Sequence, residues 1–376
     1  MVQLASKPVA VVALAWLVAC GPAAPPVHPT SPDAFAIDRA RAAAIIADGR
    51  KIVSRDGVEE LRTIPIGGIP QWISVRGRDR RNPILLMIHG GPASPDLPIS
   101  WAFQAGWEDY FTVVQWDQRG AGKTLNASDR AAVEPTLSLD RITEDAAEVV
   151  QYLRATYGQD KIFVLGHSWG SLVGLGLAQR HPEWLHAYVG MGQVISGRDN
   201  EREGYALTLQ AARAAGHAKA VAELEAIAPY PEPDGSLPIA KIGTERKWSV
   251  HFGGLTHGRD NLDYSNLGLL SPDYTAADIA AVDQGAQLSL GRLLPELARF
   301  DATQVTQLGC PIVLFEGRHD ATTPSTIAAR WLARVQAPKT QLVWFEHSAH
   351  MIMVEEPGRV LVHLVQDVLP LAGVGR

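Results

Sequence analysis

The chain has 376 residues, of which 46% are hydrophobic and 20% are charged. This composition supplies ample apolar material for one large α/β domain with an insertion, or for two domains. The formal net charge is −6 and no basic run occurs, which argues against nucleic acid as a partner.

Residues 1–19 have the features of a bacterial lipoprotein signal peptide. Lys7 precedes an apolar run over residues 9–19 that is too short to span a bilayer. The run ends in Leu17-Val18-Ala19-Cys20, which resembles the sequence read by the lipoprotein signal peptidase, so we expect Cys20 to carry a lipid. Gly21, in place of Asp, favours the outer membrane. The alternative is an ordinary secretory signal in which the cysteine is incidental.

Residues 20–36 form a second distinct segment, rich in proline, which predicts an extended tether between anchor and domain. The protein is then expected to be exported, to face the periplasm, and to touch the membrane only through its N-terminal lipid. If Cys20 is lipidated, only Cys310 remains and no intrachain disulfide can form. Cys310 stands just before a strand and is expected to be a small buried hydrophobic residue rather than a nucleophile.

Residues 37–196 predict the first part of an α/β core. Apolar residues at helical spacing mark helices, and short continuous apolar runs mark strands that are buried on both faces of a parallel sheet. The expected elements are a helix at 37–52, a hairpin of strands 59–66 and 70–77 around Gly67-Gly68, strands at 83–89 and 110–116, a helix at 139–157, and a strand at 185–194.

The centre of this core is a strand that runs from Lys161 into Gly166-His167-Ser168-Trp169-Gly170, followed by a helix of small apolar residues. A G-x-S-x-G between strand and helix predicts a nucleophile elbow, in which the glycines permit a tight turn and Ser168 is exposed on a strained backbone. The alternative is a glycine-rich packing turn.

Residues 197–305 break the alternation of strands and helices. Helical segments are expected at 201–216, 218–227, 238–252 and 274–287, separated by joints rich in proline and glycine. We interpret this block as a helical cap inserted into the core. The core then resumes over residues 306–376, with strands at 310–316 and 341–345, a helix at 326–335 and a last helix from Pro357. The prediction is an open, mostly parallel, doubly wound sheet under a lid.

A serine nucleophile needs a base, and the base needs a carboxylate to fix its tautomer. In an elbow enzyme the acid precedes the histidine, and both follow later strands. Asp320 and His350 meet this requirement. Asp320 could instead be a turn or capping residue. His347 is the rival base, and His350 is preferred because the longer loop reaches back to Ser168.

The oxyanion that develops during acyl transfer needs preorganised donors. One is expected to be the backbone N–H of Trp169, directly after the nucleophile. The second is expected from the loop after the strand that ends at His89, where we choose Gly91, with Gly90 as the second choice. The alternative for this loop is a plain turn.

Together these segments resemble the proline iminopeptidases (prolyl aminopeptidases) of the α/β-hydrolase fold. The resemblance covers about residues 59–195 and 305–370. Its motifs are His89-Gly-Gly-Pro92, Trp116-Asp-Gln-Arg-Gly-Ala-Gly-Lys-Thr124, Gly166-His-Ser-Trp-Gly170, Gly317-Arg-His-Asp320 with Thr323-Pro324, and Ala349-His350. It implies a serine hydrolase with nucleophile Ser168, acid Asp320 and base His350. It also implies an oxyanion hole from Gly91 and Trp169, and structural roles for Asp117 and Arg119.

Two departures concern the substrate. The family usually has H-G-G-P-G, and here Ala93 replaces the last glycine. Family lids often carry W-x-x-W-E, whose glutamate helps to bind the free amino terminus of the substrate, and Phe252 stands at the corresponding place after Trp248. Other lid acids could substitute, although a solvated face is the expectation for each. They are Glu201, Glu203, Glu225, Glu245 and Asp283.

The sequence therefore predicts a hydrolase that works through an acyl-enzyme, without metal or cofactor, on a short peptide or another small molecule. The preferred prediction is an aminopeptidase that releases N-terminal residues, proline above all. The alternative within enzymes is an esterase, thioesterase or lactonase for small hydrophobic acyl groups. Ser168 argues against epoxide hydrolases and haloalkane dehalogenases, which use a carboxylate nucleophile. A lipid-tethered binding protein without activity is the alternative outside enzymes.

Overall fold

A computed structural model describes residues 38–259 and 264–373. The predicted signal peptide (1–19), Cys20 and the tether (20–36) lie outside the described residues, so these predictions remain untested. The segment that follows, from Arg39 onward, forms one compact unit. No helix among the described residues is both long and apolar enough to cross a bilayer.

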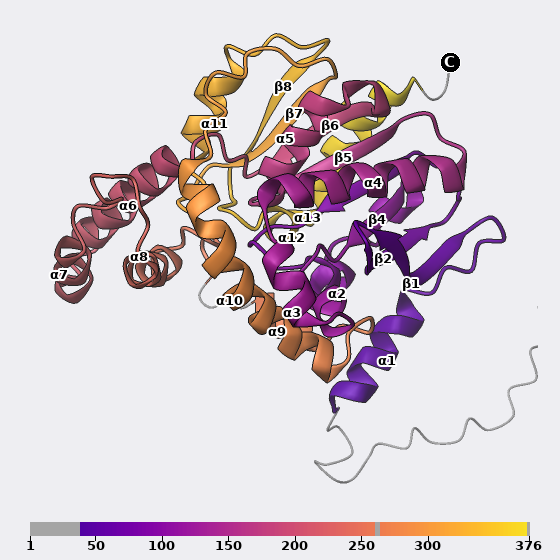
Figure 1. Cartoon of the computed structure of the whole chain (residues 1–376), viewed down its shortest axis with the longest axis horizontal. Coiled ribbons are helices and arrows are strands. Elements are labelled where there is room, and N and C mark those ends of the chain that lie inside the picture. Colours follow the sequence, from indigo (N-terminus) through magenta and orange to yellow (C-terminus); the bar gives the residue numbers. More distant parts are fainter. Residues whose placement is uncertain (1–37, 260–263, 374–376) are drawn as a thin grey trace, which may run out of the picture. The chain divides into compact units, whose positions relative to one another are not determined.

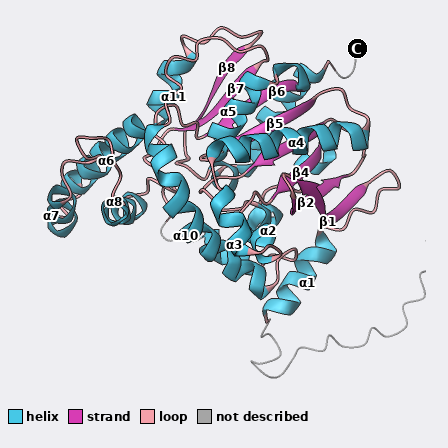
Figure 2. Ribbon diagram, viewed as in Figure 1, coloured by secondary structure: helices cyan, strands magenta, loops and turns pink. Residues whose placement is uncertain are grey.

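This unit is built around one eight-stranded sheet with the order β1-β2-β4-β3-β5-β6-β7-β8 (Figures 1 and 2). The strands are β1 (Val58–Ile66), β2 (Ile69–Gly77), β3 (Ile84–Ile88), β4 (Thr112–Trp116), β5 (Ile162–His167), β6 (Leu185–Met191), β7 (Ile312–Gly317) and β8 (Thr340–Phe345). The six strands β4, β3, β5, β6, β7 and β8, in this order across the sheet, pair in parallel. Strand β2 pairs antiparallel with β1 and with β4. The predicted hairpin turns at Gly67 and Gly68, whose φ angles of 54° and 79° suit glycine.

The sheet is covered on both faces, which explains the continuous apolar runs in the sequence. Alternate residues of β3 belong to two different core clusters. Ile84, Leu86 and Ile88 pack with α4 (Leu139–Tyr157) and α5 (Gly170–Arg180) on one face. Leu85 and Met87 pack on the other face with aromatic side chains and with the C-terminal helices. The predicted doubly wound α/β architecture is confirmed.

Helix α4 is the longest helix of the core outside the segment between β6 and β7. The predicted helix over 139–157 has the bounds of α4, because Ser138 accepts a hydrogen bond from the Arg141 N–H at its start and Gly158 ends it with a φ of 64°. The others are α1 (Arg39–Gly49), α2 (Gly122–Asn126), α3 (Arg130–Val133), α11 (Ser325–Leu332), α12 (Ile352–Glu355) and α13 (Pro357–His363), the last continued by a π-helical turn, Leu364–Val368.

Between β6 and β7 the described residues form five helices, and we call these helices, with their described connections, the cap. They are α6 (Gly197–Ala214), α7 (Ala218–Ala226), α8 (Ile239–His251), α9 (Tyr264–Leu269) and α10 (Ala276–Arg299). Helices α6, α7 and α8 pack on one another, while α10 packs against α2 of the core (Figure 1). No helix was expected where α9 lies, and the helix expected at 274–287 is too short, because α10 continues to Arg299 through a stretch in which Leu293 and Leu294 are buried.

Candidate active site

Ser168 stands in the turn between β5 and α5, with a left-handed backbone at φ 54°. The two flanking glycines allow this turn. A Cβ on Gly166 would lie 2.5 Å from the Gly170 carbonyl oxygen, and a Cβ on Gly170 would lie 2.0 Å from the Ile88 carbonyl oxygen. A left-handed φ is uncommon for serine and is typical of strained functional positions. The turn therefore presents the Ser168 side chain at the carboxyl end of the sheet, as an elbow requires.

Asp320 and His350 follow β7 and β8 and contact each other directly. His350 Nδ1 lies 2.8 Å from Asp320 Oδ2, and the Thr323 hydroxyl donates to the same oxygen at 2.8 Å. The backbone N–H groups of Thr322 and Thr323 donate to the other oxygen, Oδ1, at 2.8 and 2.7 Å. A carboxylate accepts only, so the proton of a neutral His350 ring is on Nδ1 and Nε2 is left as a base.

Ser168 and His350 line the same cavity, which has a volume of about 290 Å³. His347, the rival base, is exposed and does not line it. The lining also includes both candidate oxyanion glycines and two residues of cap helix α8, Arg246 and Val250. The cavity lining consists of Gly90, Gly91, Ser94, Pro95, Asp96, His167, Ser168, Arg246, Val250, Leu255, Thr322, His350 and Met351.

The loop after β3 approaches the nucleophile closely. A Cβ on Gly90 would lie 2.9 Å from Ser168 Cβ, so only glycine fits there. Gly91 has a φ of 114°, and a Cβ on it would lie 2.6 Å from the Ser94 nitrogen. Among the described residues, neither the Gly91 N–H nor the Trp169 N–H donates to a backbone carbonyl. Both amides therefore remain available as donors.

Ala93, which replaces a family glycine, has a left-handed φ of 58°. This conformation explains why glycine is usual at the position, since a residue with a Cβ is strained there. For alanine this left-handed conformation costs about 1 kcal/mol.

His89 anchors the same loop from within the core. The Gln118 N–H donates to its Nε2 at 3.2 Å, and its Nδ1 lies 2.9 Å from the Gly90 carbonyl oxygen. These partners require the proton on Nδ1, so the ring is neutral. Burial lowers the pKa of His89 to about 4, which keeps it neutral over the physiological range.

Asp117 and Arg119 do not line the cavity, in line with the structural roles that the resemblance implies. Arg119 Nε donates to Asp145 of α4 at 2.8 Å, and its NH2 group donates to the Gly67 carbonyl at 2.8 Å. Asp117 accepts hydrogen bonds from the Lys123 N–H at 2.8 Å and from the Tyr274 hydroxyl. Burial raises the pKa of Asp117 to about 7. These contacts join the core strands to α4 and to the start of α10.

Two of the cap acids differ from the expectation of a solvated face. Glu201 and Glu245 are buried, and both bind the guanidinium group of Arg246. Tyr230 donates to Glu201, and Thr208 donates to Glu245 at 2.9 Å. Neither acid lines the cavity, because Arg246 stands between them and the substrate space. The helical periodicity of a single sequence could not show this pairing.

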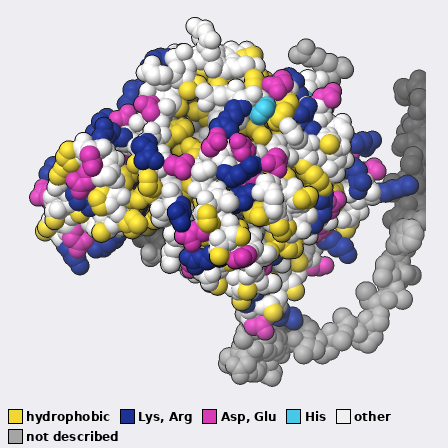
Figure 3. Space-filling view, in the orientation of Figure 1, with side chains coloured by type: hydrophobic (Ala, Val, Ile, Leu, Met, Phe, Trp, Pro, Cys, Tyr) yellow, Lys and Arg dark blue, Asp and Glu magenta, His cyan; other side chains and the backbone are white. Residues whose placement is uncertain are grey.

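The remaining three cap acids are on the outside. Glu203 pairs with Arg330 and Glu225 with Arg213 across exposed surfaces, and Asp283 is exposed. On the face shown in Figure 3, acidic and basic side chains are interspersed rather than gathered by sign. These three acids therefore behave as the solvated face that the sequence predicts.

Sequence reasoning missed most of the cavity lining, including its three other ionisable residues, Asp96, His167 and Arg246. The first two could have been noticed, because Asp96 lies in the loop that carries Gly91 and His167 precedes the nucleophile. Arg246 carries no local signal, since its place depends on how the cap folds over the core. Within residues 38–259 and 264–373, no three side chains of the metal-binding types are grouped as a metal ion would need.

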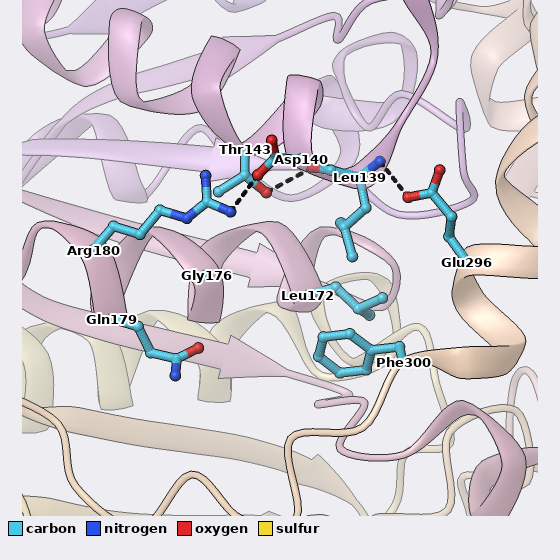
Figure 4. A pocket seen from close by; sticks show the side chains of 9 residues that line it. All are labelled: Leu139, Asp140, Thr143, Leu172, Gly176, Gln179, Arg180, Glu296 and Phe300. Atoms are coloured by element: carbon cyan, nitrogen blue, oxygen red, sulfur yellow. Dashed lines mark hydrogen bonds and ion pairs between the residues drawn. The ribbon is translucent and has the colours of Figure 1, made fainter.

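A second hollow, of about 430 Å³, lies between α4, α5 and the end of α10, and it differs chemically from the first (Figure 4). Its charged groups are already paired. Arg180 donates to Asp140 at 2.5 Å, and Glu296 accepts the Leu139 N–H at 2.8 Å. It contains no nucleophile beside a base, so the cavity at Ser168 is the candidate active site.

The comparisons with known proteins agree with this fold. A family model described as the alpha/beta hydrolase fold matches residues 83–357. The chain belongs to the alpha/beta hydrolase fold family.

Two curated proteins are similar to the chain in sequence over most of its length. It is 30% identical over 309 residues to the probable aminopeptidase YbaC of Bacillus subtilis, a match that covers 81% of this chain and 95% of that protein. It is 26% identical over 284 residues to a proline iminopeptidase of Heyndrickxia coagulans, which covers 74% and 87%. The resemblance to proline iminopeptidases that the motifs indicated is thus confirmed.

A solved structure of a putative lipase from Acinetobacter baumannii matches with a TM-score of 0.61 at 15% identity. The match covers 91% of this chain and 99% of that one. At this identity the likeness shows the fold alone.

Proposed function

We propose that the protein is a serine hydrolase with Ser168 as nucleophile, His350 as base and Asp320 as the acid that orients the base. The observation that carries this proposal is the meeting of three distant segments at one end of the sheet. A strained serine and a histidine share one cavity, and the histidine lies 2.8 Å from a carboxylate that accepts three further hydrogen bonds, from the Thr322 N–H, the Thr323 N–H and the Thr323 hydroxyl.

Each group has one role in the proposed reaction. Ser168 Oγ attacks the scissile carbonyl while His350 Nε2 takes its proton, and Asp320 stabilises the imidazolium that forms. The N–H groups of Gly91 and Trp169 stabilise the oxyanion. His350 then gives the proton to the leaving group, and an acyl-enzyme at Ser168 remains. A water molecule, deprotonated by the same histidine, hydrolyses this intermediate and releases the acid.

The substrate is proposed to be a short peptide from which the N-terminal residue is released. The names of the two curated relatives support a peptidase, and the small cavity favours a substrate with little chain before the scissile bond. Val250, Leu255 and Met351 supply apolar contacts for a side chain such as that of proline. The same machinery would cleave a small ester, which is the competing proposal.

One comparison separates these two substrates. The quantity to compare is the catalytic proficiency, which is kcat/KM divided by the rate constant of the uncatalysed hydrolysis. We expect it to be larger for proline-naphthylamide than for p-nitrophenyl butyrate. The Ser168→Ala variant should lack both activities. Turnover of the ester with none of the amide would overturn the peptidase proposal and leave the serine hydrolase standing.

We also propose that the mature protein is an exported lipoprotein, anchored through Cys20 and facing the periplasm at the outer membrane. The support is the sequence of residues 7–21. In a bacterial host, the wild type should incorporate an alkyne-tagged fatty acid and the Cys20→Ser variant should not. Equal labelling of the two would contradict lipidation at this residue.

A further inference from the structure

Two residues that line the catalytic cavity each have a buried polar atom without a hydrogen-bond partner among the described residues. The two atoms are Asp96 Oδ2 and His167 Nδ1. The residues are only 4% and 3% exposed, and both line the cavity that contains Ser168. A buried carboxylate oxygen without a donor is costly, so its presence beside a nucleophile points to a ligand that supplies the donor.

The histidine of this pair acts as an acceptor when it is neutral. Its Nε2 lies 3.3 Å from the His350 carbonyl oxygen, which only accepts, so the ring proton is on Nε2 and Nδ1 has a free lone pair. Nδ1 and Asp96 Oδ2 are 3.7 Å apart, too far for a direct hydrogen bond. A nitrogen with two N–H groups can lie about 2.8 Å from both atoms.

The charge at this place favours a cation over a neutral donor. Asp96 supplies a negative charge, and a charged hydrogen bond in a buried site is stronger than a neutral one. Burial disfavours the imidazolium form of His167, but Asp96 outweighs burial and raises the pKa of His167. When a protonated amine binds, its positive charge therefore takes the place of the His167 proton that Asp96 stabilises. A primary ammonium or the secondary ammonium of an N-terminal proline carries the two N–H groups that the pair requires.

The position of the pair relative to Ser168 suits an amino terminus. Ser168 and His167 both lie close to Gly90. A Cβ on Gly90 would lie 2.9 Å from Ser168 Cβ and 3.5 Å from His167 Nδ1. In an N-terminal residue the amine is two bonds from the scissile carbonyl carbon. An amine bound by the pair therefore leaves room for one residue before the bond that Ser168 attacks.

We propose that Asp96, together with His167, binds the protonated amino terminus of the substrate and so restricts cleavage to the first peptide bond. The inference rests on the proposed peptidase function. It assigns to the oxyanion loop a task for which the buried cap acids are not free, because Glu201 and Glu245 are bound to Arg246.

The test is protection of Ser168 from a fluorophosphonate label by small ligands. Prolinamide carries the amine, and cyclopentanecarboxamide has the same ring and amide without it. In the wild type, prolinamide should protect at a concentration at least about 10-fold lower than its isostere. The Asp96→Asn variant should lose most of this difference, by about 10- to 100-fold in the protecting concentration of prolinamide. The Asp140→Asn variant, at an exposed aspartate of α4, is the matched control and should retain it.

The outcomes separate the two proposals. If proline-naphthylamide is not cleaved but protection depends on the amine and on Asp96, the amine site stands and the peptidase proposal falls. If the amide is cleaved while Asp96→Asn is protected like the wild type, the amine site is wrong and the peptidase stands. A second measurement needs no variant. Prolinamide with two methyl groups on its ring nitrogen keeps the positive charge but has no ammonium N–H. Protection by this compound equal to that by prolinamide would overturn the inference.

Discussion

The histidine at the end of β3 supports the oxyanion loop only in its neutral form. His89 donates through Nδ1 and accepts through Nε2, and burial lowers its pKa to about 4 from an ordinary value of 6.5. Protonation would remove the acceptor that holds the Gln118 N–H. The loop that carries Gly91 therefore depends on the charge state of one buried side chain.

This linkage predicts acid sensitivity with a defined sign. Between pH 6.5 and about 4 the unfolded chain binds a proton at His89 that the folded chain does not. The stability contributed by the neutral ring is thus complete above pH 6.5 and is lost as the pH falls toward 4, by up to about 3 kcal/mol. The free energy of unfolding in urea should show this as a difference between wild type and His89→Gln that shrinks with falling pH. His347→Gln, at an exposed histidine, is the control, and a difference for His89→Gln that does not change with pH would contradict the assignment.

At the scale of the elements, the elbow depends on contact between backbones rather than between side chains. Helix α5 starts so close to β3 that a methyl group on Gly170 would overlap the Ile88 carbonyl oxygen. No rotamer change can relieve this contact, because both partners are main chain. The junction of β3, β5 and α5 is therefore the least adaptable part of the site.

The matched pair Gly170→Ala and Gly243→Ala tests this point. Gly243 lies in cap helix α8 with nothing within 4 Å of its added Cβ. We expect Gly243→Ala to raise the free energy of unfolding by about 0.5–1 kcal/mol, because alanine is the better helix former. Gly170→Ala should lower it by at least about 2 kcal/mol through overpacking. Similar values for the two variants would mean that the backbones of α5 and β3 can move apart to accept a methyl group.

The elements also show what a single sequence can predict. The strands and α4 follow from apolar periodicity and capping residues, which are local signals, and the spacing of motifs after strands selects Ser168, Asp320 and His350 for one end of a parallel sheet. The extension of α10 past Pro295 depends on tertiary packing, which no local signal contains. The same holds for Arg246, whose most distant partner in the sequence, Glu201, is 45 residues away.

At the scale of the whole unit, the cap is held together by a buried charge cluster. Glu201 of α6 and Glu245 of α8 both bind Arg246, and Tyr230 and Thr208 complete the hydrogen bonds. The cluster fixes α6 against α8 and also brings Arg246 to the wall of the cavity. Stability of the cap and shape of the substrate space therefore depend on the same residues.

Removal of the central cation should destabilise the protein strongly. Arg246→Met leaves two buried carboxylates without a cation, although each keeps a hydroxyl donor, and this is expected to cost about 3–5 kcal/mol in unfolding free energy. Arg213→Met, which breaks an exposed pair with Glu225, should cost less than about 1 kcal/mol. Adding Glu201→Gln and Glu245→Gln to Arg246→Met should restore most of the loss. Failure of this rescue would mean that the arginine acts by packing and not by charge.

The reaction assigned to the site depends on one covalent step at one residue. Intact-protein and peptide mass spectrometry after treatment with a fluorophosphonate measures that step directly. We predict one adduct per chain, located at Ser168, absent in Ser168→Ala and formed at least about 100-fold more slowly in His350→Gln. An adduct on another residue, or unchanged labelling in His350→Gln, would contradict the account.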